Sequence, residues 1–347
     1  MKVRIFASTA RFSAPFSTAY SKLSSRPLLL LSLEDDDGVL GFGEAAPLEP
    51  YDGVSIDHVR DALADCVPLL RDSDGTARAE LLPACREIAV LPQAVAAIDL
   101  AVWDLAGRRA GEPVWRLLGA SNPSPVEVNW TIGTIDRAGA AREAAQAHDA
   151  GFKCVKVKVG VGDDAGRVAA VRAAGGPELA IRLDANGAWS AAEATAALAS
   201  LAPAGIELCE EPASGVEEIL RVSAASDVAI AIDETAAAPG ALEQRCCEAV
   251  CLKIARCGGL SGMIEQASRA RDAGYDVYVA STFDGPLGIA AALHAAAVIK
   301  PRRPCGLATL GLFQGPPDPL PARQGRIAPP DGPGLGDGLA GWYHDAG

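Results

Sequence analysis

Histidine is scarce in this chain of 347 residues: it has four, and none lies at the end of an apolar run. Because histidine is a frequent general base and zinc ligand, this placement argues against histidine-based catalysis and a His-rich zinc site. The Gly-x-Ser-x-Gly motif of serine hydrolases is also absent. The nine cysteines include no Cys-x-x-Cys pair. We interpret them as reduced thiols of a cytoplasmic protein.

Long apolar segments and excess positive charge are lacking as well. No apolar run approaches the roughly 18–20 residues that span a bilayer, and residues 1–6 do not resemble the apolar core of a signal peptide. Lysine and arginine number 31 against 44 acidic residues, a net charge of −13. Such a surface repels phosphate backbones and anionic lipids, so we expect neither a nucleic-acid nor a membrane partner.

Residues 1–122 have the mixed pattern of a small α+β domain. Residues 28–33 predict a strand, residues 35–38 a turn, and residues 39–44 the second strand of a hairpin. Helical spacing of apolar residues follows over three ranges, 56–72, 77–89 and 93–109.

From about residue 125, short apolar runs alternate with Ala-rich helical segments. Strands that alternate with helices form parallel βαβ units, and eight such units close into a barrel. We therefore expect a barrel over residues 123–315, with one irregular helix, and an open doubly wound sheet is the alternative. The Pro- and Gly-rich residues 316–347 are expected to return to the N-terminal domain. The runs recur every 21–28 residues and begin near Val126, Lys153, Leu179, Ile206, Val228, Ala249, Asp276 and Pro304.

Lysines occupy unusual positions in two of these runs. Lys156 and Lys158 alternate with valines, and residues two apart share one face of a strand. If the valines face the helices, both lysines point into the barrel, where they need carboxylate partners or a lowered pKa. A solvated edge strand is the alternative. Lys253 is a single cation in a later run and would face them across the barrel; alternatively, its ammonium reaches solvent at the strand end.

Three successive runs each end in a carboxylate, at Asp184, Glu210 and Asp233. Catalytic side chains of barrels lie at the carboxyl ends of the strands, and a set of carboxylate oxygens suits Mg²⁺. A single Asp at a strand end is often a helix cap, which does not explain three in succession. We expect Arg182, Asn186 and Glu234 beside these ligands. Burial, the metal and neighbouring cations such as Arg182 would lower a lysine pKa and make that lysine a base near neutral pH.

Together these motifs resemble the enolase superfamily, in its muconate-lactonizing-enzyme subgroup. The resemblance extends over nearly the whole chain. It implies an α/β fold, a modified (β/α)7β TIM-like barrel with an α+β capping domain. The matching segments are residues 41–47 (GFGEAAP), 97–104 (AIDLAVWD), 156–158 (K-x-K), 184–186 (DAN), 210–212 (EEP), 233–235 (DET), and Lys253 with Gly258 and Gly259.

The resemblance also implies a chemistry and its residues. Asp184, Glu210 and Asp233 would hold Mg²⁺, while Lys158 and Lys253 would lie on opposite faces of a small carboxylate substrate with Lys156 assisting. The shared step is removal of a proton α to a carboxylate, which gives an enediolate. Members of the superfamily often form symmetric assemblies, so a homo-oligomer is a further expectation. Six residues are expected to contact substrate: Tyr20, Tyr51, Ser281, Thr282, Asp284 and Gly306.

The particular reaction stays open among related enzymes. Dipeptide epimerases carry an Asp-x-Asp pair on the last barrel strand, whereas residues 303–308 contain no carboxylate. Residues 281–288 and 305–310 resemble o-succinylbenzoate synthases, so a lyase is predicted first, a dehydration in which Lys158 moves the proton. The alternative is an isomerase that uses Lys158 and Lys253 as acid and base: a muconate cycloisomerase, an N-acylamino-acid racemase or a dipeptide epimerase. A non-catalytic binding protein is a third alternative.

Overall fold

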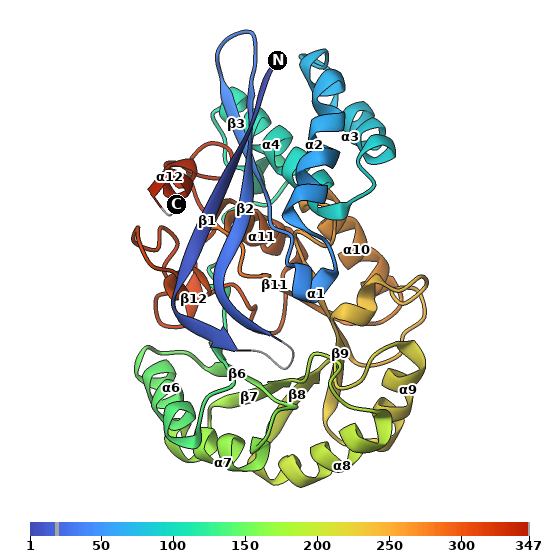
Figure 1. The fold of residues 1–347 in the computed structure, drawn as a ribbon, viewed down its shortest axis with the longest axis vertical. Coiled ribbons are helices and arrows are strands. Elements are labelled where there is room, and N and C mark those ends of the chain that lie inside the picture. Colours follow the sequence, from blue (N-terminus) through green and yellow to red (C-terminus); the bar gives the residue numbers. More distant parts are fainter. Residues whose placement is uncertain (18–20, 346–347) are drawn as a thin grey trace.

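The first part of the chain forms an antiparallel sheet that belongs to the capping domain (Figure 1). The computed structural model describes residues 1–17 and 21–345. In this sheet β1 (Lys2–Ser17) pairs with β2 (Lys22–Glu34), and β2 pairs with β3 (Leu40–Ala45). The predicted β2–β3 hairpin is confirmed. β1 was not predicted, because its apolar residues are separated by serines, arginines and small residues.

Helices α2 (Ile56–Arg71), α3 (Arg78–Ile88) and α4 (Pro92–Ala110) lie beside this sheet, close to their predicted ranges. Gly43 lets α4 approach β3, since a Cβ at this position would lie 1.9 Å from the carbonyl oxygen of Ala97. The short helices α1 (Glu49–Asp52) and α5 (Val114–Leu117) complete this part of the chain.

The barrel is a parallel sheet in which neighbouring strands follow the order of the sequence from β5 to β11. Bridges from Val128 to Cys305 and from Ala280 to Gly306 close it, so the TIM-like barrel is confirmed and the open sheet is not adopted. The strands are β5 (Trp130–Ile132), β6 (Cys154–Lys158), β7 (Ala180–Asp184), β8 (Ile206–Glu210), β9 (Ala229–Ile232), β10 (Ala249–Lys253) and β11 (Asp276–Ala280).

Helices surround this sheet, and the unit after β9 is the irregular one, with the short 3-10 helix η2 (Glu234–Ala237). The first predicted run differs from the structure. Its start forms β4 (Val126–Glu127), which pairs with β12 (Arg326–Ile327), and the barrel strand begins at Trp130 instead. The barrel helices are α6 (Arg137–Asp149), α7 (Asp164–Gly175), α8 (Ala191–Leu201), α9 (Val216–Ala225), α10 (Leu260–Asp272) and α11 (Pro286–Ile299), with η1 (Ala202–Ala204) after α8.

The C-terminal segment runs back along the barrel to the capping sheet (Figure 1). The backbone N–H of Val114 donates to the carbonyl oxygen of Gly334, and the Tyr343 hydroxyl donates to Glu44 on β3. These contacts tie the end of the chain to the capping domain. The elements of this segment are η3 (Leu310–Leu312), β12, η4 (Leu339–Gly341) and α12 (Trp342–Asp345).

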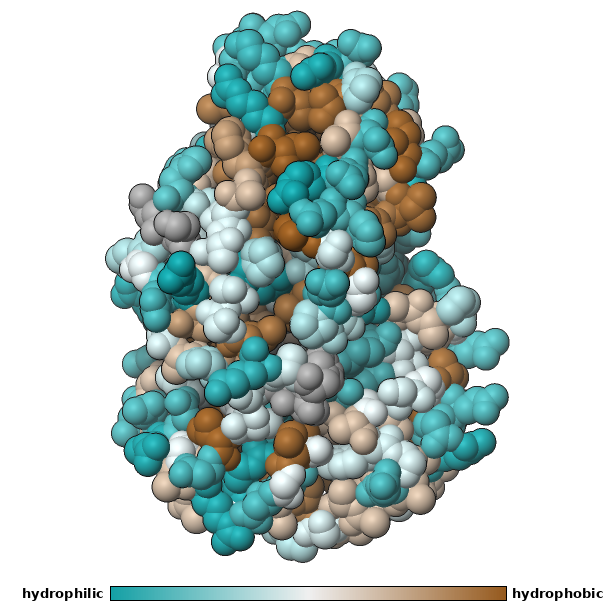
Figure 2. All heavy atoms as spheres, in the orientation of Figure 1, coloured by the Kyte–Doolittle hydropathy of each residue, from teal (hydrophilic) through white to brown (hydrophobic). Residues whose placement is uncertain are grey.

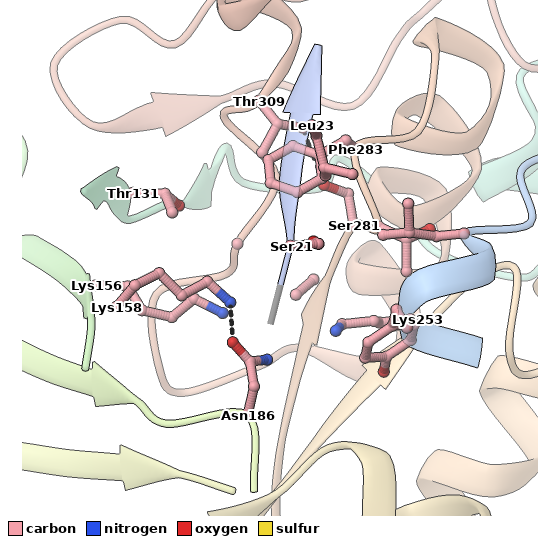
Figure 3. A pocket seen from close by; sticks show the side chains of 15 residues that line it. Ser21, Leu23, Thr131, Lys156, Lys158, Asn186, Lys253, Ser281, Phe283 and Thr309 are labelled. Atoms are coloured by element: carbon pink, nitrogen blue, oxygen red, sulfur yellow. Dashed lines mark hydrogen bonds between the residues drawn. The ribbon is translucent and has the colours of Figure 1, made fainter. Parts of the chain in front are cut away.

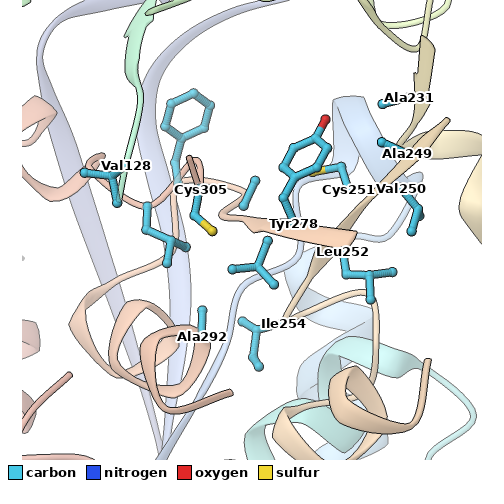
Figure 4. Packing of buried hydrophobic residues seen from close by; sticks show 14 of the residues in the cluster. Val128, Ala231, Ala249, Val250, Cys251, Leu252, Ile254, Tyr278, Ala292 and Cys305 are labelled. Atoms are coloured by element: carbon cyan, nitrogen blue, oxygen red, sulfur yellow. The ribbon is translucent and has the colours of Figure 1, made fainter. Parts of the chain in front are cut away.

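One hydrophobic core fills the barrel and its contact with the capping sheet, and another lies between β2, β3 and helices α2 to α4. Figure 4 shows part of the barrel core, in which Ile254 packs near Ala292 of α11. In Figure 2, hydrophobic surface gathers over the capping domain, whereas the barrel face is mostly polar or neutral. No helix in the described part of the chain is long and apolar enough to cross a membrane.

Candidate active site

Lys156 and Lys158 point into the barrel, as the alternation of β6 predicts. The intervening valines are completely buried on the helix side, and the two lysines are only 8% and 7% exposed. The Lys156 Nζ lies 2.9 Å from Asp184 Oδ2 and 3.1 Å from Glu210 Oε1. The Lys158 Nζ donates to Asp184 Oδ2 at 2.6 Å. The lysines therefore have the carboxylate partners that burial demands.

The three predicted metal ligands lie side by side because their strands are neighbours in register. Asp184 on β7 pairs with Glu210 on β8, and Asp233 follows β9 directly. All three are nearly or completely buried. Ligand atoms of Glu210, Asp233 and Cys251 lie within 4.8 Å of one another, and one ammonium, that of Lys156, contacts both Asp184 and Glu210. The carboxylate oxygens of Asp184, Glu210 and Asp233 are hard donors that already neutralise positive charge, so these three residues fit a divalent cation.

Lys253 approaches the cluster from β10, opposite β6 (Figure 3). Its ammonium donates to Asp233 and lies 4.1 Å from the centre of the Tyr51 ring, a cation–π contact. The Tyr51 hydroxyl donates to Asp233 Oδ1 at 2.7 Å. A capping-domain residue on α1 thus contacts both a lysine and a predicted metal ligand, which places the mouth of the barrel under this helix.

Asn186 and Glu234 connect the strand ends. The Asn186 side chain accepts from Lys158 at 2.8 Å and donates to Glu234 Oε1 at 3.0 Å. Glu211, next to the predicted ligand Glu210, accepts from the backbone N–H groups of Asp233 and Thr235. Asn186 and Glu211 have positive φ angles of 49° and 41°, a strained conformation that clusters at functional sites.

Burial and charge move several pKa values. Burial alone would lower the pKa of Lys156 and Lys253, but the adjacent carboxylates outweigh it and raise both. Burial would raise the pKa of Asp184, and the ammonium groups of Lys156 and Lys158 reverse this and lower it. The predicted lowering of the lysine pKa is therefore wrong for Lys156 and Lys253 in this structure, because each ammonium lies directly against carboxylates. A divalent cation on the same carboxylates would oppose that effect.

Arg182 lies deeper in the barrel than predicted. Its guanidinium pairs with Glu207 at 2.9 Å and donates to the Pro304 carbonyl, and it stacks 5.1 Å from the centre of the Tyr278 ring. The Tyr278 hydroxyl in turn donates to Glu210 Oε2 at 2.7 Å. Arg182 thus reaches the carboxylate cluster only through Tyr278. Sequence reasoning missed Tyr278, although alternation along β11 would have placed it inside the barrel.

A cavity of about 50 Å³ has Lys156 and Lys158 on one side and Lys253 on the other. Ligand pockets usually measure about 300–1,000 Å³, so side chains at its mouth must move to admit a substrate. Of the predicted contacts, Tyr51, Ser281, Thr282 and Gly306 line it. The lining residues are Ser21, Leu23, Leu48, Tyr51, Thr131, Lys156, Lys158, Asn186, Lys253, Ala280, Ser281, Thr282, Phe283, Gly306 and Thr309.

The predicted contact Asp284 is not among the residues that line the cavity. Asp284 is completely buried below the pocket wall, where it accepts from the Thr282 hydroxyl at 2.6 Å, and burial raises its pKa. Its carboxylate faces the domain contact near Arg26 and Glu44 rather than the cavity. Tyr20 lies outside the described residues. The lining residues Leu23, Thr131 and Thr309 were not predicted, because no motif marks a wall formed by side chains from several elements.

Comparison with known families gives the same assignment as the geometry. The family described as mandelate racemase/muconate lactonizing enzyme, N-terminal domain, matches residues 1–119, and the enolase C-terminal domain-like family matches residues 139–340. The chain therefore belongs to the enolase superfamily, in its muconate-lactonizing-enzyme subgroup.

Individual relatives have isomerase names. The N-succinyl-L-Arg/Lys racemase of Bacillus cereus is 27% identical over 85% of this chain and 83% of its own, and its crystal structure superposes with a TM-score of 0.90. Muconate cycloisomerase 1 of Rhodococcus opacus is 29% identical over 93% of this chain and 91% of its own. A dipeptide epimerase from Cytophaga hutchinsonii, solved with Mg and the dipeptide D-Ala-L-Val, has a TM-score of 0.90 at 25% identity, covering 98% of this chain and 97% of its own. These names favour the isomerase alternative over the dehydration predicted first.

Proposed function

We propose that this protein is a Mg²⁺-dependent racemase or epimerase that moves the α-proton of an N-acylated amino acid. The observation that carries the proposal is the placement of lysine ammonium groups on opposite sides of one pocket. Lys158 enters from β6 and Lys253 from β10 (Figure 3), and each ammonium donates to a carboxylate of the cluster. A transfer between two faces of one carbon needs an acid and a base arranged in this way.

Asp184, Glu210 and Asp233 would hold the Mg²⁺. When bound, this cation would stabilise the negative charge that develops on the substrate carboxylate during proton removal. Their burial and their hydrogen bonds, from Tyr51 to Asp233 and from Tyr278 to Glu210, fix the carboxylates in place.

The lysines would divide the proton transfer between them. One amine takes the α-proton from its face of the substrate, and the ammonium on the other face gives a proton to the same carbon. For the opposite enantiomer the roles are exchanged, so both lysines return to their starting state after a forward and a reverse turnover. Asn186, which accepts from Lys158, keeps that amine directed at the pocket, and Lys156 remains a cation that offsets the developing negative charge.

The lack of a carboxylate among the described lining residues supports an acylated rather than a free amino group. Among the described residues that line the cavity there is no carboxylate, and residues 305–307, at the last bridge of the barrel, are Cys-Gly-Leu. A substrate ammonium would find no anionic partner in this wall. Hydroxyl groups of Ser281, Thr282 and Thr309 can instead bond to an amide.

The test is exchange of the α-proton in D₂O, followed by NMR for each enantiomer of a panel of N-succinyl and N-acetyl amino acids, with dipeptides as the comparison. We expect Mg²⁺-dependent exchange with both enantiomers of an N-acyl substrate, and removal of the metal by a chelator should stop it. Exchange with dipeptides alone would overturn the acyl preference. No exchange with any α-substituted carboxylate would overturn the proposed reaction.

An o-succinylbenzoate synthase is the second candidate. The same lack of a carboxylate among the described lining residues and the resemblance of residues 305–310 favour it, because its substrate also lacks an ammonium group. In that reaction Lys158 would remove the proton and return it to the departing hydroxyl, while Lys253 stays an ammonium held by Asp233 and Tyr51. Dehydration of the synthase substrate, measured beside the exchange assay, separates the two candidates.

A further inference from the structure

Cys251 lies on the floor of the carboxylate cluster. It shares the inward face of β10 with Lys253, and its register partner on β11 is Tyr278, whose hydroxyl donates to Glu210. Figure 4 shows the Cys251 sulfur beside the Tyr278 ring. The thiol therefore sits directly below the proposed Mg²⁺ ligands, although no step of the proposed reaction uses it.

The Cys251 thiol points at two of these ligands. Its Sγ and carboxylate oxygens of Glu210 and Asp233 lie within 4.8 Å of one another. Cys251 is 2% exposed, and its Sγ has no hydrogen-bond partner in the described part of the chain. Cys257, six residues further on, is also buried, but its thiol donates to Gln266 at 3.3 Å.

A sulfur donor changes which cations such a cluster prefers. Mg²⁺ takes oxygen ligands, whereas Zn²⁺ and Cd²⁺ also bind thiolates. In a tetrahedral zinc site, bonds of about 2.3 Å to sulfur and about 2.0–2.2 Å to oxygen place two ligands about 3.5–3.7 Å apart. The three ligand atoms around Cys251 lie within 4.8 Å of one another, so side-chain rotations that move them by about 1 Å bring all three into range.

We propose that Glu210, Asp233 and Cys251 form a binding site for thiophilic divalent cations, such as Zn²⁺ and Cd²⁺, that overlaps the Mg²⁺ site. The inference rests on the proposed function, because it shares two of the Mg²⁺ ligands. As the metal–sulfur bond forms, the thiol proton passes to solvent, and the Lys253 ammonium leaves Asp233. A cation bound to Cys251 would draw Glu210 and Asp233 away from Asp184. It would therefore exclude Mg²⁺ from its site and inhibit proton transfer.

Cadmium titration of the chelator-treated full chain tests the site through the ultraviolet charge-transfer absorption of cadmium thiolates. We expect a band that Cys251→Ser lacks and Cys257→Ser retains, and a weaker apparent Cd²⁺ affinity when Mg²⁺ is present. The comparison of the two variants separates this site from other cysteines, and the competition by Mg²⁺ shows that the two cation sites overlap. Calorimetry should show Cd²⁺ affinity at least tenfold weaker in Cys251→Ser, with Mg²⁺ affinity within about threefold of the parent protein.

An unchanged band in Cys251→Ser, or an apparent Cd²⁺ affinity that saturating Mg²⁺ does not weaken, would overturn the proposal. Cadmium NMR of the unmodified protein provides a measurement that needs no variant, since a Mg²⁺-displaceable cadmium ion with an all-oxygen chemical shift would also refute it. These failures leave the proposed function standing if Mg²⁺ still binds and supports exchange. Absence of Mg²⁺ binding to the unmodified protein would refute both.

Discussion

Replacing Lys253 by methionine removes one ammonium group from the pocket and keeps a side chain of similar length. In the structure this ammonium donates to Asp233 and packs on the Tyr51 ring. If both lysines transfer protons, the variant loses interconversion of the enantiomers. It keeps proton exchange for the one enantiomer whose α-proton faces Lys158.

The expected magnitudes follow from the burial of this ion pair. Positioned general acid–base groups accelerate a reaction by about 10²–10⁴, so the rate of interconversion should fall by that factor. This corresponds to a rise of about 3–5 kcal/mol in activation free energy. Breaking a buried ion pair costs about 3–5 kcal/mol, but Asp233 keeps the hydroxyl of Tyr51 at 2.7 Å. We therefore expect the free energy of unfolding of the metal-free variant to fall by about 3 kcal/mol, the lower end of that range. Saturating Mg²⁺ should restore much of this loss.

The assay follows α-deuterium incorporation in D₂O by NMR, separately for each enantiomer, with interconversion measured by polarimetry. Lys158→Met is the matched control, and it should retain exchange for the opposite enantiomer. Thermal unfolding with and without Mg²⁺ shows whether each variant is folded. The two-lysine account would be refuted if Lys253→Met kept interconversion within about threefold, or if folded, Mg²⁺-bound Lys158→Met and Lys253→Met retained exchange for the same enantiomer.

Other predictions concern stability. Tyr51→Phe removes the hydroxyl that donates to Asp233 and should lower the free energy of unfolding of the metal-free protein by about 1–2 kcal/mol in urea titrations; no loss would contradict that bond. Burial lowers the pKa of His294 to about 4, so its stabilising contribution is complete above about pH 6.5 and is lost as the pH falls through 4. Between pH 7 and 4 this loss is about 3 kcal/mol in free energy of unfolding, and the variant His294→Gln should not show it. Parallel curves of unfolding free energy against pH for the two proteins would contradict the prediction. Gly43→Ala forces β3 and α4 apart, because its Cβ would meet the Ala97 carbonyl, and should cost at least about 1–3 kcal/mol in the same titrations.

Most of the barrel could be predicted because its signals are local. The alternation of Lys156 and Lys158 with valines, and the carboxylates that follow successive strands, depend on short-range geometry that a sequence displays directly. Parallel strands then bring these ends together at one face. The first barrel strand was misplaced because Val126 and Glu127 form a separate pair with residues 326–327, a contact about 200 positions away that no local pattern reveals.

Details of the site depended on three-dimensional contacts. Arg182 shares a strand face with Asp184, yet its guanidinium lies deeper in the barrel because it pairs with Glu207 on the neighbouring strand. Asp284 follows a strand end as the predicted metal ligands do, but the backbone turns at Phe283, with a φ of 58°, and the buried carboxylate accepts from the Thr282 hydroxyl. The lysine pKa values followed direct ion pairing, which sequence spacing does not determine.

A crystal structure with Mg²⁺ and an unreactive N-acyl amino acid analogue would test the central claim most directly. We expect the metal on Asp184, Glu210 and Asp233, and the Nζ atoms of Lys158 and Lys253 at about 3–3.5 Å from the α-carbon on opposite faces. A complex with both amines on one side of that carbon, or with the metal bound away from these carboxylates, would contradict it.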